Sequence, residues 1–257
     1  MAMTSSEALQ SLAVHPDLIS ADERRFLDEN GYLPLDNILT EGEVTYLRDR
    51  LDKIAESEGA AAGSELHTEE GTVRLGNLLD KDPLFEKFIT TPRVLAAITH
   101  VIGTNIQLSS LSSRAAQPNG QGQQILHADW KEAVEPGNYF VCNAAWLIDD
   151  YSEENGGTRV IPGSHRCGES PQDVLADPLA DHPDQVIFTG RAGSVIVFNS
   201  HLWHGGRTNH SNGLRRGVLS YFVRRGAPYI QNDHKELLSE ETKVRLSTEA
   251  LTLSAAL

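Results

Sequence analysis

The tripeptide His127-Ala128-Asp129 constrains this chain more than any other stretch. In extended backbone, side chains two positions apart point to the same face, so His127 and Asp129 present an imidazole and a carboxylate toward one point. A third donor of suitable type comes much later, as His204 in the segment 198–206. Two neutral imidazoles and one carboxylate on one side of a divalent iron leave its other positions open. The pattern therefore indicates an open metal site that joins distant parts of the chain.

Other histidines compete for the third ligand position. His201 is also of the right type, whereas His210 lies in the turn-forming stretch 209–213 and is expected to be solvated. We favour His204 because it ends an apolar run and precedes two glycines, where backbone or a cofactor can approach closely. A His-x-Asp pair alone occurs by chance in many proteins, so the assignment depends on the rest of the chain.

The length and the charge limit the class of protein. The 257 residues, 39% of them hydrophobic, suffice for one large domain with a buried core. The formal net charge of -14 argues against nucleic acid and anionic membranes as partners, and a cationic, zwitterionic or neutral substrate fits it more easily than a polyphosphate. The N-terminus lacks the regions of a secretory signal, no apolar run is long enough for a membrane span, and two cysteines imply no disulfide framework. We expect a cytoplasmic protein, and the sequence does not indicate its oligomeric state.

Helix signals dominate the first part of the chain. Ser20 with Glu23 reads as a capping box before a helix that stops at Gly31, and the stretch 40–43 repeats the signal. Thr91-Pro92 opens a further helix that ends near residue 103. These patterns predict three helices that pack on another layer.

Strand signals take over from residue 105, as short apolar runs separated by Gly, Pro and Asn turns. We therefore predict a mainly β fold with flanking helices, in a single domain over 1–257. Its parts are helices over about 20–104, a two-sheet jelly roll over about 105–225 and a last helix over about 235–247. Residues 1–19 lack periodicity and predict an irregular start. The polar excursion 164–184 is long enough to cover a site.

A guanidinium follows the third histidine. If residues 204–215 form a hairpin, Arg215 lies on the strand beside His204. A buried Arg can hold a carboxylate through two parallel hydrogen bonds. Arg215 and Arg216 could equally be a solvated pair at a strand end, so the residues alone leave this point open.

Together these pieces resemble the phytanoyl-CoA dioxygenase family of Fe(II)/2-oxoglutarate oxygenases. The resemblance covers about residues 22–225. It rests on Asp28-Glu29-Asn30-Gly31-Tyr32-Leu33, on His127-Ala128-Asp129, on the Asn-Gly-Gly and Pro-Gly-Ser-His motifs within 154–165, and on His204-Gly205-Gly206 followed by Arg215. In the family, an Arg eleven positions after the distal His binds 2-oxoglutarate, which selects Arg215 over Arg216. The family fold is a double-stranded β-helix, which is a jelly roll.

The resemblance implies an oxidoreductase that uses Fe(II), 2-oxoglutarate and O2, with His127, Asp129 and His204 as catalytic metal ligands. Such an enzyme hydroxylates or desaturates an unactivated C–H bond and releases succinate and CO2. The expected substrate is a small metabolite or a natural-product intermediate. Asp129 argues against halogenation, because related halogenases have a small residue there that leaves room for chloride.

The resemblance also points to weaker positions around the site. Trp146 and Thr158 match positions close to the cosubstrate, and Arg74 lies where some relatives place a cation that reaches the site. Trp130 and Asn143 are candidates for the lining of the substrate pocket. Each of these five side chains could equally serve only for packing.

Two other functions stay open at this point. A cupin-like barrel could use the same three ligands for metal-dependent hydrolysis or isomerisation, although Arg215 and the lack of a fourth protein ligand argue against this. A non-catalytic jelly roll that binds a small molecule is the second alternative, and the intact ligand set argues against it. Succinate release that depends on Fe(II) and on a candidate substrate would separate the three.

Overall fold

The computed structural model describes residues 3–64, 66, 70–120, 123–130, 132 and 134–256. Its strands are β1 (Tyr32–Leu35), β2 (Thr72–Leu75), β3 (Ile106–Ala116), β4 (Val141–Leu147), β5 (Arg159–Val160), β6 (Val186–Ile187), β7 (Val195–Asn199), β8 (His204–Gly205) and β9 (Arg215–Arg224). Its helices are α1 (Ser5–Ser11), α2 (Ala21–Asn30), α3 (Glu41–Glu58), α4 (Lys87–Thr90), α5 (Pro92–Ile102), α6 (Pro171–Val174), α7 (His234–Leu237), α8 (Glu240–Arg245) and α9 (Thr248–Leu253).

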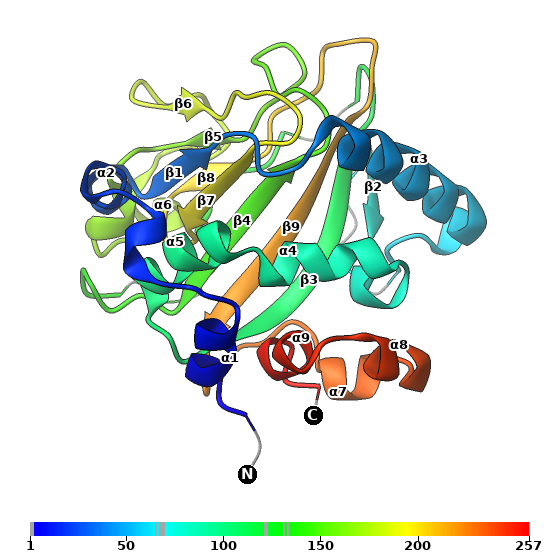
Figure 1. Ribbon diagram of the computed structural model, residues 1–257. Helices are drawn as coiled ribbons and strands as arrows, with labels where there is room; N and C mark the ends of the chain where they lie inside the picture. The colour runs from blue at the N-terminus through cyan, green and yellow to red at the C-terminus, as the bar shows by residue number, and fades with distance from the viewer. Residues whose placement is uncertain are drawn as a thin grey trace.

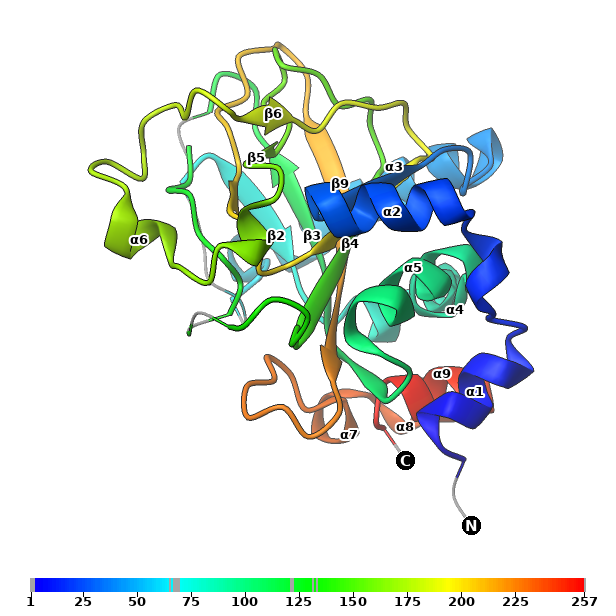
Figure 2. The same ribbon diagram turned by 90° about the vertical axis from the view of Figure 1, so that its left-hand side faces the viewer.

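Two antiparallel sheets form the centre of the molecule (Figure 1). The larger has six strands in the order β1-β7-β4-β9-β3-β2, and the smaller has three in the order β6-β5-β8. Most helices lie on one side of the large sheet, and the small sheet and α6 lie on the other (Figure 2). This is the predicted mainly β jelly roll with flanking helices, and its two sheets leave an inner face on which a site can be built.

The predicted helix starts are confirmed. Ser20 accepts a hydrogen bond from the Glu23 amide, and the Glu23 carboxylate accepts one from the Ser20 amide, so both orphan donors are satisfied. α2 ends at Gly31 with φ of 83°, a left-handed conformation that favours glycine. The capping box at Thr40 and the Pro start of α5 also lie where the sequence predicts them.

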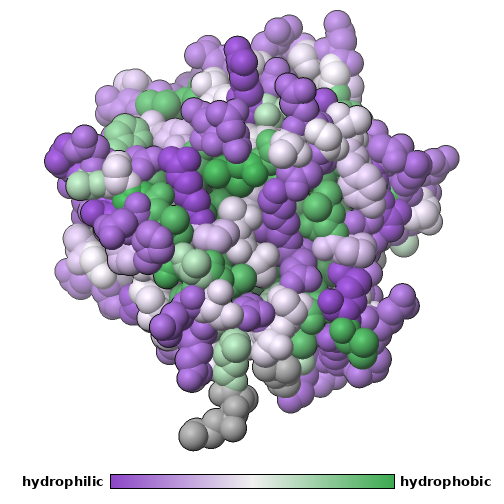
Figure 3. Space-filling view, in the orientation of Figure 1, coloured by the Kyte–Doolittle hydropathy of each residue, from purple (hydrophilic) through white to green (hydrophobic). Residues whose placement is uncertain are grey.

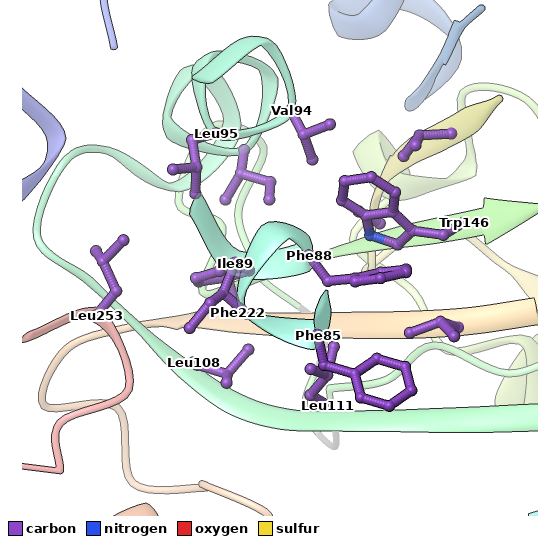
Figure 4. Close-up of a cluster of buried hydrophobic side chains, with 14 of the residues drawn as sticks. Phe85, Phe88, Ile89, Val94, Leu95, Leu108, Leu111, Trp146, Phe222 and Leu253 are labelled. Atoms are coloured by element: carbon purple, nitrogen blue, oxygen red, sulfur yellow. The ribbon is translucent and has the colours of Figure 1, made fainter. Parts of the chain in front are cut away.

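The main core lies between the helices and the outer face of the large sheet (Figure 4). Phe88 of α4 packs on Trp146 of β4, with ring centroids 4.5 Å apart, and Phe222 of β9 lies near Ile89 in the same buried cluster. Along β4 these core side chains alternate with residues that face the small sheet, which is the period of two expected for a sheet covered on both faces. The core therefore fixes which side chains the large sheet turns inward.

Three parts of the prediction differ from the structure. Residues 5–11 form α1, opened by a capping box of Thr4 and Glu7, where an irregular start was expected. β1 and β2 come from the stretch expected to hold only helices, and they pair with β7 and β3. The C-terminal stretch forms three short helices instead of one. Four-residue strands and short helices are too short to show a clear hydrophobic periodicity. They also depend on packing against distant parts of the chain, which local sequence does not reveal.

The face of the molecule shown in Figure 3 is largely hydrophilic, and its apolar side chains lie in separate areas. None of the described helices is both long enough and apolar enough to span a membrane.

Three buried histidines make the fold sensitive to acid. Burial lowers the pKa of His165, His201 and His234 to about 4. In an unfolded chain a histidine has a pKa of about 6.5, so between these values the unfolded state binds more protons and stability rises with pH. Acidification from pH 6.5 toward 4 should lower the free energy of unfolding by up to about 1.4 kcal/mol per pH unit for each histidine.

Urea unfolding of the metal-free protein at pH 7 and pH 5 measures this effect. His234 suits the test because its side chain is 2% exposed and neither ring nitrogen has a hydrogen-bond partner within the described part of the chain. The variant His234→Gln should lose less stability on acidification than the wild type. An equal loss in both proteins would contradict the assignment to this side chain.

Candidate metal centre

His127 and His204 are held side by side by their own backbones. The His127 amide donates to the His204 carbonyl at 2.9 Å, and the His204 amide returns the bond at 2.9 Å. Their ring centroids are 4.4 Å apart. The segment around His127 pairs with β8 through this bridge, and its Asp129 amide donates to the Ser200 carbonyl at 2.8 Å. The bridge attaches Asp129 to the edge of the small sheet as well.

Backbone carbonyls orient both imidazoles. Nδ1 of His127 lies 3.0 Å from the Ile125 carbonyl oxygen, and Nδ1 of His204 lies 2.8 Å from that of Leu202. A carbonyl only accepts, so each Nδ1 carries the proton and each Nε2 offers its lone pair. Such bonds are typical of metal-ligating histidines, because they fix the tautomer and the ring plane.

The three donor groups converge on one point. Oδ1 of Asp129 lies 3.7 Å from Nε2 of His127 and 3.6 Å from Nε2 of His204, and one donor atom from each residue lies within 4.8 Å of the others. Donors about 2.1 Å from a metal and at right angles would be about 3 Å apart. The three side chains therefore fit one divalent ion after a small adjustment. His201 is not in this group, since its Nε2 accepts a hydrogen bond from the Phe140 amide.

Charge favours an ionised carboxylate at this point. Burial alone would raise the pKa of Asp129, but the attraction of His204 and its hydrogen bond outweigh burial and lower that pKa to about 2. In return Asp129 raises the pKa of His204, although burial acts in the opposite direction. A divalent cation would supply this positive charge in place of a protonated imidazole, because metal ligands must be deprotonated.

Arg215 brings a buried cation to the same cavity. The residue is 2% exposed, and its guanidinium lies over the Tyr151 ring at 4.5 Å. Burial lowers its pKa, yet arginine stays protonated in proteins. Its Nε and Nη2 atoms have no hydrogen-bond partner within the part of the chain that the structure describes. Buried donors are normally paired with an acceptor. A carboxylate of a bound 2-oxo acid would accept hydrogen bonds from both Nε and Nη2.

The predicted hairpin from 204 to 215 is wrong. β8 pairs with β5 in the small sheet, whereas β9 pairs with β3 and β4 in the large one. Arg215 therefore approaches His204 from the opposite sheet instead of from a neighbouring strand. Gly217 follows Arg215 on the same face, and a side chain there would collide with the Tyr151 hydroxyl. This glycine thus leaves room for the tyrosine that packs against Arg215.

A cavity of about 520 Å³ lies between the sheets and contains all four groups. Its volume is within the range of pockets that enclose drug-sized ligands. Three of the weaker sequence candidates, Arg74, Asn143 and Thr158, also line it. The cavity can therefore hold a metal, a small dicarboxylate and a further organic molecule together.

The structure places the two tryptophan candidates elsewhere. Trp146 is fully buried on the outer face of β4, where its Nε1 donates to Ser220 Oγ, and Figure 4 shows it within the helix-facing core. Asn143 and Ala145 of β4 line the cavity, so the odd-numbered positions face inward and Trp146 cannot. Trp130 stacks on Phe140 with centroids 4.9 Å apart and is absent from the described lining of the cavity. Neither tryptophan is among the described residues that line the cavity.

Four further lining residues have no signal in the sequence that marks them as part of a site. Tyr151, Ser110, Gln231 and Asn232 lie in loops or on a strand with no chemical motif around them. The excursion 164–184, expected to cover the site, supplies none of the described lining residues and packs instead against the backbone of Leu126. Runs of Ser, Asn and Gln are ordinary turn composition, so only the fold identifies which of them face a cavity.

Comparisons with known proteins identify one family and one fold. The model of the phytanoyl-CoA dioxygenase (PhyH) family matches residues 27–217. Ectoine dioxygenase of Bordetella bronchiseptica is 26% identical over 235 residues, which cover 80% of this chain and 76% of that protein.

The solved structure of EctD from S. alaskensis with 2-oxoglutarate and 5-hydroxyectoine has a TM-score of 0.66 at 22% identity, over 80% of this chain and 76% of its own. HygX from Streptomyces hygroscopicus with nickel, 2-oxoglutarate and hygromycin B has a TM-score of 0.62 at 18% identity, over 81% and 88%. These likenesses confirm the jelly-roll fold.

Proposed function

The chain belongs to the phytanoyl-CoA dioxygenase family, and on this premise we propose how it works as a 2-oxoglutarate-dependent non-haem iron dioxygenase. His127, Asp129 and His204 hold one Fe(II), and Arg215 holds the far carboxylate of 2-oxoglutarate. The observation that carries the proposal is the meeting, in a single cavity, of three metal donors and one buried guanidinium whose Nε and Nη2 have no hydrogen-bond partner among the described residues.

The bound iron, 2-oxoglutarate and O2 supply the oxidising chemistry, in which the oxo acid becomes succinate and CO2 and a substrate C–H bond becomes an alcohol or is desaturated. The protein orients the reactants. The carbonyls of Ile125 and Leu202 hold both imidazoles in the ligating tautomer, and Arg215 fixes the cosubstrate tail through two parallel hydrogen bonds. The enclosing sheets keep bulk water from the reacting atoms.

The substrate we propose is a small molecule. Solved relatives carry small organic molecules, 5-hydroxyectoine in one and hygromycin B in the other, beside 2-oxoglutarate. The cavity volume fits such a molecule, and the net charge of -14 disfavours nucleic acid. We propose a small metabolite or a natural-product intermediate, hydroxylated or desaturated at an unactivated C–H bond.

An anaerobic titration tests the proposal. Fe(II) and then 2-oxoglutarate are added to the wild-type protein, and the visible charge-transfer band of a 2-oxo acid chelated to Fe(II) is followed. We expect the band to saturate at one iron and one 2-oxoglutarate per chain. A protein that binds iron without producing this band, or that binds neither, would refute the proposal.

A further inference from the structure

The wall of the cavity has two chemically different ends. In the β3–β9 ladder, Ala116 pairs with Arg215 at one end and Ser110 pairs with Tyr221 at the other. Six residues of strand span about 20 Å, so the two ends are well separated. The Tyr221 hydroxyl donates to the Asp129 carbonyl at 3.2 Å, which places this second end beside the metal ligands. With 2-oxoglutarate held at Arg215, the Tyr221 end remains for the substrate.

Three strands contribute a row of side chains to this end. Tyr221 of β9 pairs with Ser110 of β3 on one side and with Asn143 of β4 on the other. All three residues line the cavity. Asn143 is 5% exposed, and its Oδ1 has no hydrogen-bond partner within the described residues. A buried amide oxygen without a hydrogen-bond donor costs stability. A bound ligand that donates a hydrogen bond to Asn143 Oδ1 would remove this cost.

A loop after β9, residues 226–233, completes this end, and we call it the C-terminal strap (Figure 2). A β-bulge between Leu108 and Ser110 frees Ser109 from the ladder. Ser109 then accepts two hydrogen bonds from the strap, at Oγ from the Gln231 amide (2.7 Å) and at its carbonyl from the Asn232 amide (3.0 Å). Ser110 Oγ donates to the side chain of Gln231.

The far part of the strap is attached to the segment that follows Asp129. The Tyr229 hydroxyl donates to Glu132 Oε1 at 2.7 Å, and its ring meets Trp130 edge-on at 5.1 Å. The strap therefore joins the bulge of β3 to the segment after a metal ligand, and it brings Asn232 into the cavity. Nδ2 of Asn232 is buried without a partner in the described part of the chain, as Oδ1 of Asn143 is.

We propose that the substrate is anchored between Asn143 and the C-terminal strap through an uncharged hydroxyl or amide group. This inference rests on the proposed function and names the substrate class of the same site. Each Asn side chain can both donate and accept, and hydroxyl and amide groups do the same, so such groups match the chemistry of both buried amides. An anion would leave the Asn143 acceptor unsatisfied, and a cation would leave the Asn232 donor unsatisfied.

The charges in the cavity support this division. In the described lining, Ser110, Asn143, Tyr221 and Asn232 at the strap end are uncharged. Arg114 pairs with Gly217, two residues from Arg215, so it belongs to the cosubstrate end. An anionic substrate held by the arginines is the rival, and it predicts the opposite preference between matched probes.

Four probes with one ring skeleton test the inference: benzamide, benzyl alcohol, benzoate and benzylammonium. Their dissociation constants are measured by saturation-transfer NMR on the full chain loaded with Zn(II), a diamagnetic substitute, and 2-oxoglutarate. We expect benzamide and benzyl alcohol to bind at least about tenfold more tightly than either ion. Asn143→Leu and Asn232→Leu should each weaken benzamide about tenfold, the effect of one lost hydrogen bond. Ile230→Thr, an exposed strap position outside the described lining, should leave it unchanged.

Tightest binding of benzoate, equal binding of all four probes, or unchanged benzamide binding in both Asn variants would overturn the inference. Calorimetric binding of 2-oxoglutarate to the same wild-type sample separates it from the proposed function. Intact 2-oxoglutarate binding with the wrong probe preference refutes only the inference, whereas loss of 2-oxoglutarate binding refutes the function. If Asn143→Leu does not fold, Asn232→Leu decides, because its position lies in a loop.

Discussion

Asp129→Ala is expected to reduce substrate-dependent succinate formation by more than about 100-fold. Asp129 is the only carboxylate in the described donor group, and its Oδ1 lies 3.7 Å and 3.6 Å from the two imidazole Nε2 atoms. Loss of a partner outside the ligand shell already costs 10- to 100-fold in metal affinity or activity, so loss of a ligand should cost more. Iron per chain, measured after gel filtration, should fall together with turnover.

The exposed acid Asp184 offers a matched control. Its side chain is 81% exposed and lies outside the donor group. Asp184→Ala removes the same charge from the chain and should keep wild-type iron content and turnover. Circular dichroism of both variants establishes that they are folded. An Asp129→Ala protein with wild-type turnover would show that the metal ligands have been assigned to the wrong residues.

Arg215→Ala is expected to raise the KM for 2-oxoglutarate by at least about thirtyfold. Removal of one partner of a buried, hydrogen-bonded charge pair costs 2–5 kcal/mol, which corresponds to factors from about thirty to several thousand. Arg215→Lys keeps the charge but not the two parallel bonds, so its KM should lie between those of the wild type and Arg215→Ala. Steady-state succinate formation over a range of 2-oxoglutarate concentrations measures all three.

The neighbouring arginine is the control for this effect. Arg216 faces away from the cavity and forms ion pairs with Asp149 at 2.9 Å and with Asp52 at 2.8 Å. Arg216→Lys preserves the charge of that network and should leave the KM for 2-oxoglutarate unchanged. If Arg216→Lys and Arg215→Ala raised the KM equally, the effect would reflect general damage to β9 and not the loss of a carboxylate ligand.

Local signals in the sequence predicted the starts of α2, α3 and α5 and the ends of α2 and α5, but not α1 or the division of the C-terminal helices. Ser20 and Thr40 cap helices through hydrogen bonds to residues three positions away, and Gly31 ends the helix just before it. Such local effects can be predicted without knowledge of the fold. β1 and β2 escaped prediction because each has four residues and depends on pairing with a strand far away in the sequence. The same limit explains the failed hairpin, since no local pattern shows that β8 and β9 enter different sheets.

The site was predictable where chemistry requires unusual residue types. The His-x-Asp pair alone is too common to identify a site, but together with the resemblance to a family it pointed to His204 and Arg215, which the structure places in the same cavity. Trp146 shows where this reasoning fails, because a one-residue step along a strand moves a side chain to the other face. Asn232 shows the opposite failure, since the bulge at Ser109 that anchors its loop leaves no trace in the sequence.

Iron-edge anomalous diffraction from anaerobic crystals grown with Fe(II) and 2-oxoglutarate tests the central claim most directly. The account predicts one iron peak within bonding distance of His127 Nε2, Asp129 Oδ1 and His204 Nε2, and a carboxylate against the Nε and Nη2 atoms of Arg215. An iron peak bound by other side chains, or a cosubstrate whose tail does not contact Arg215, would contradict it.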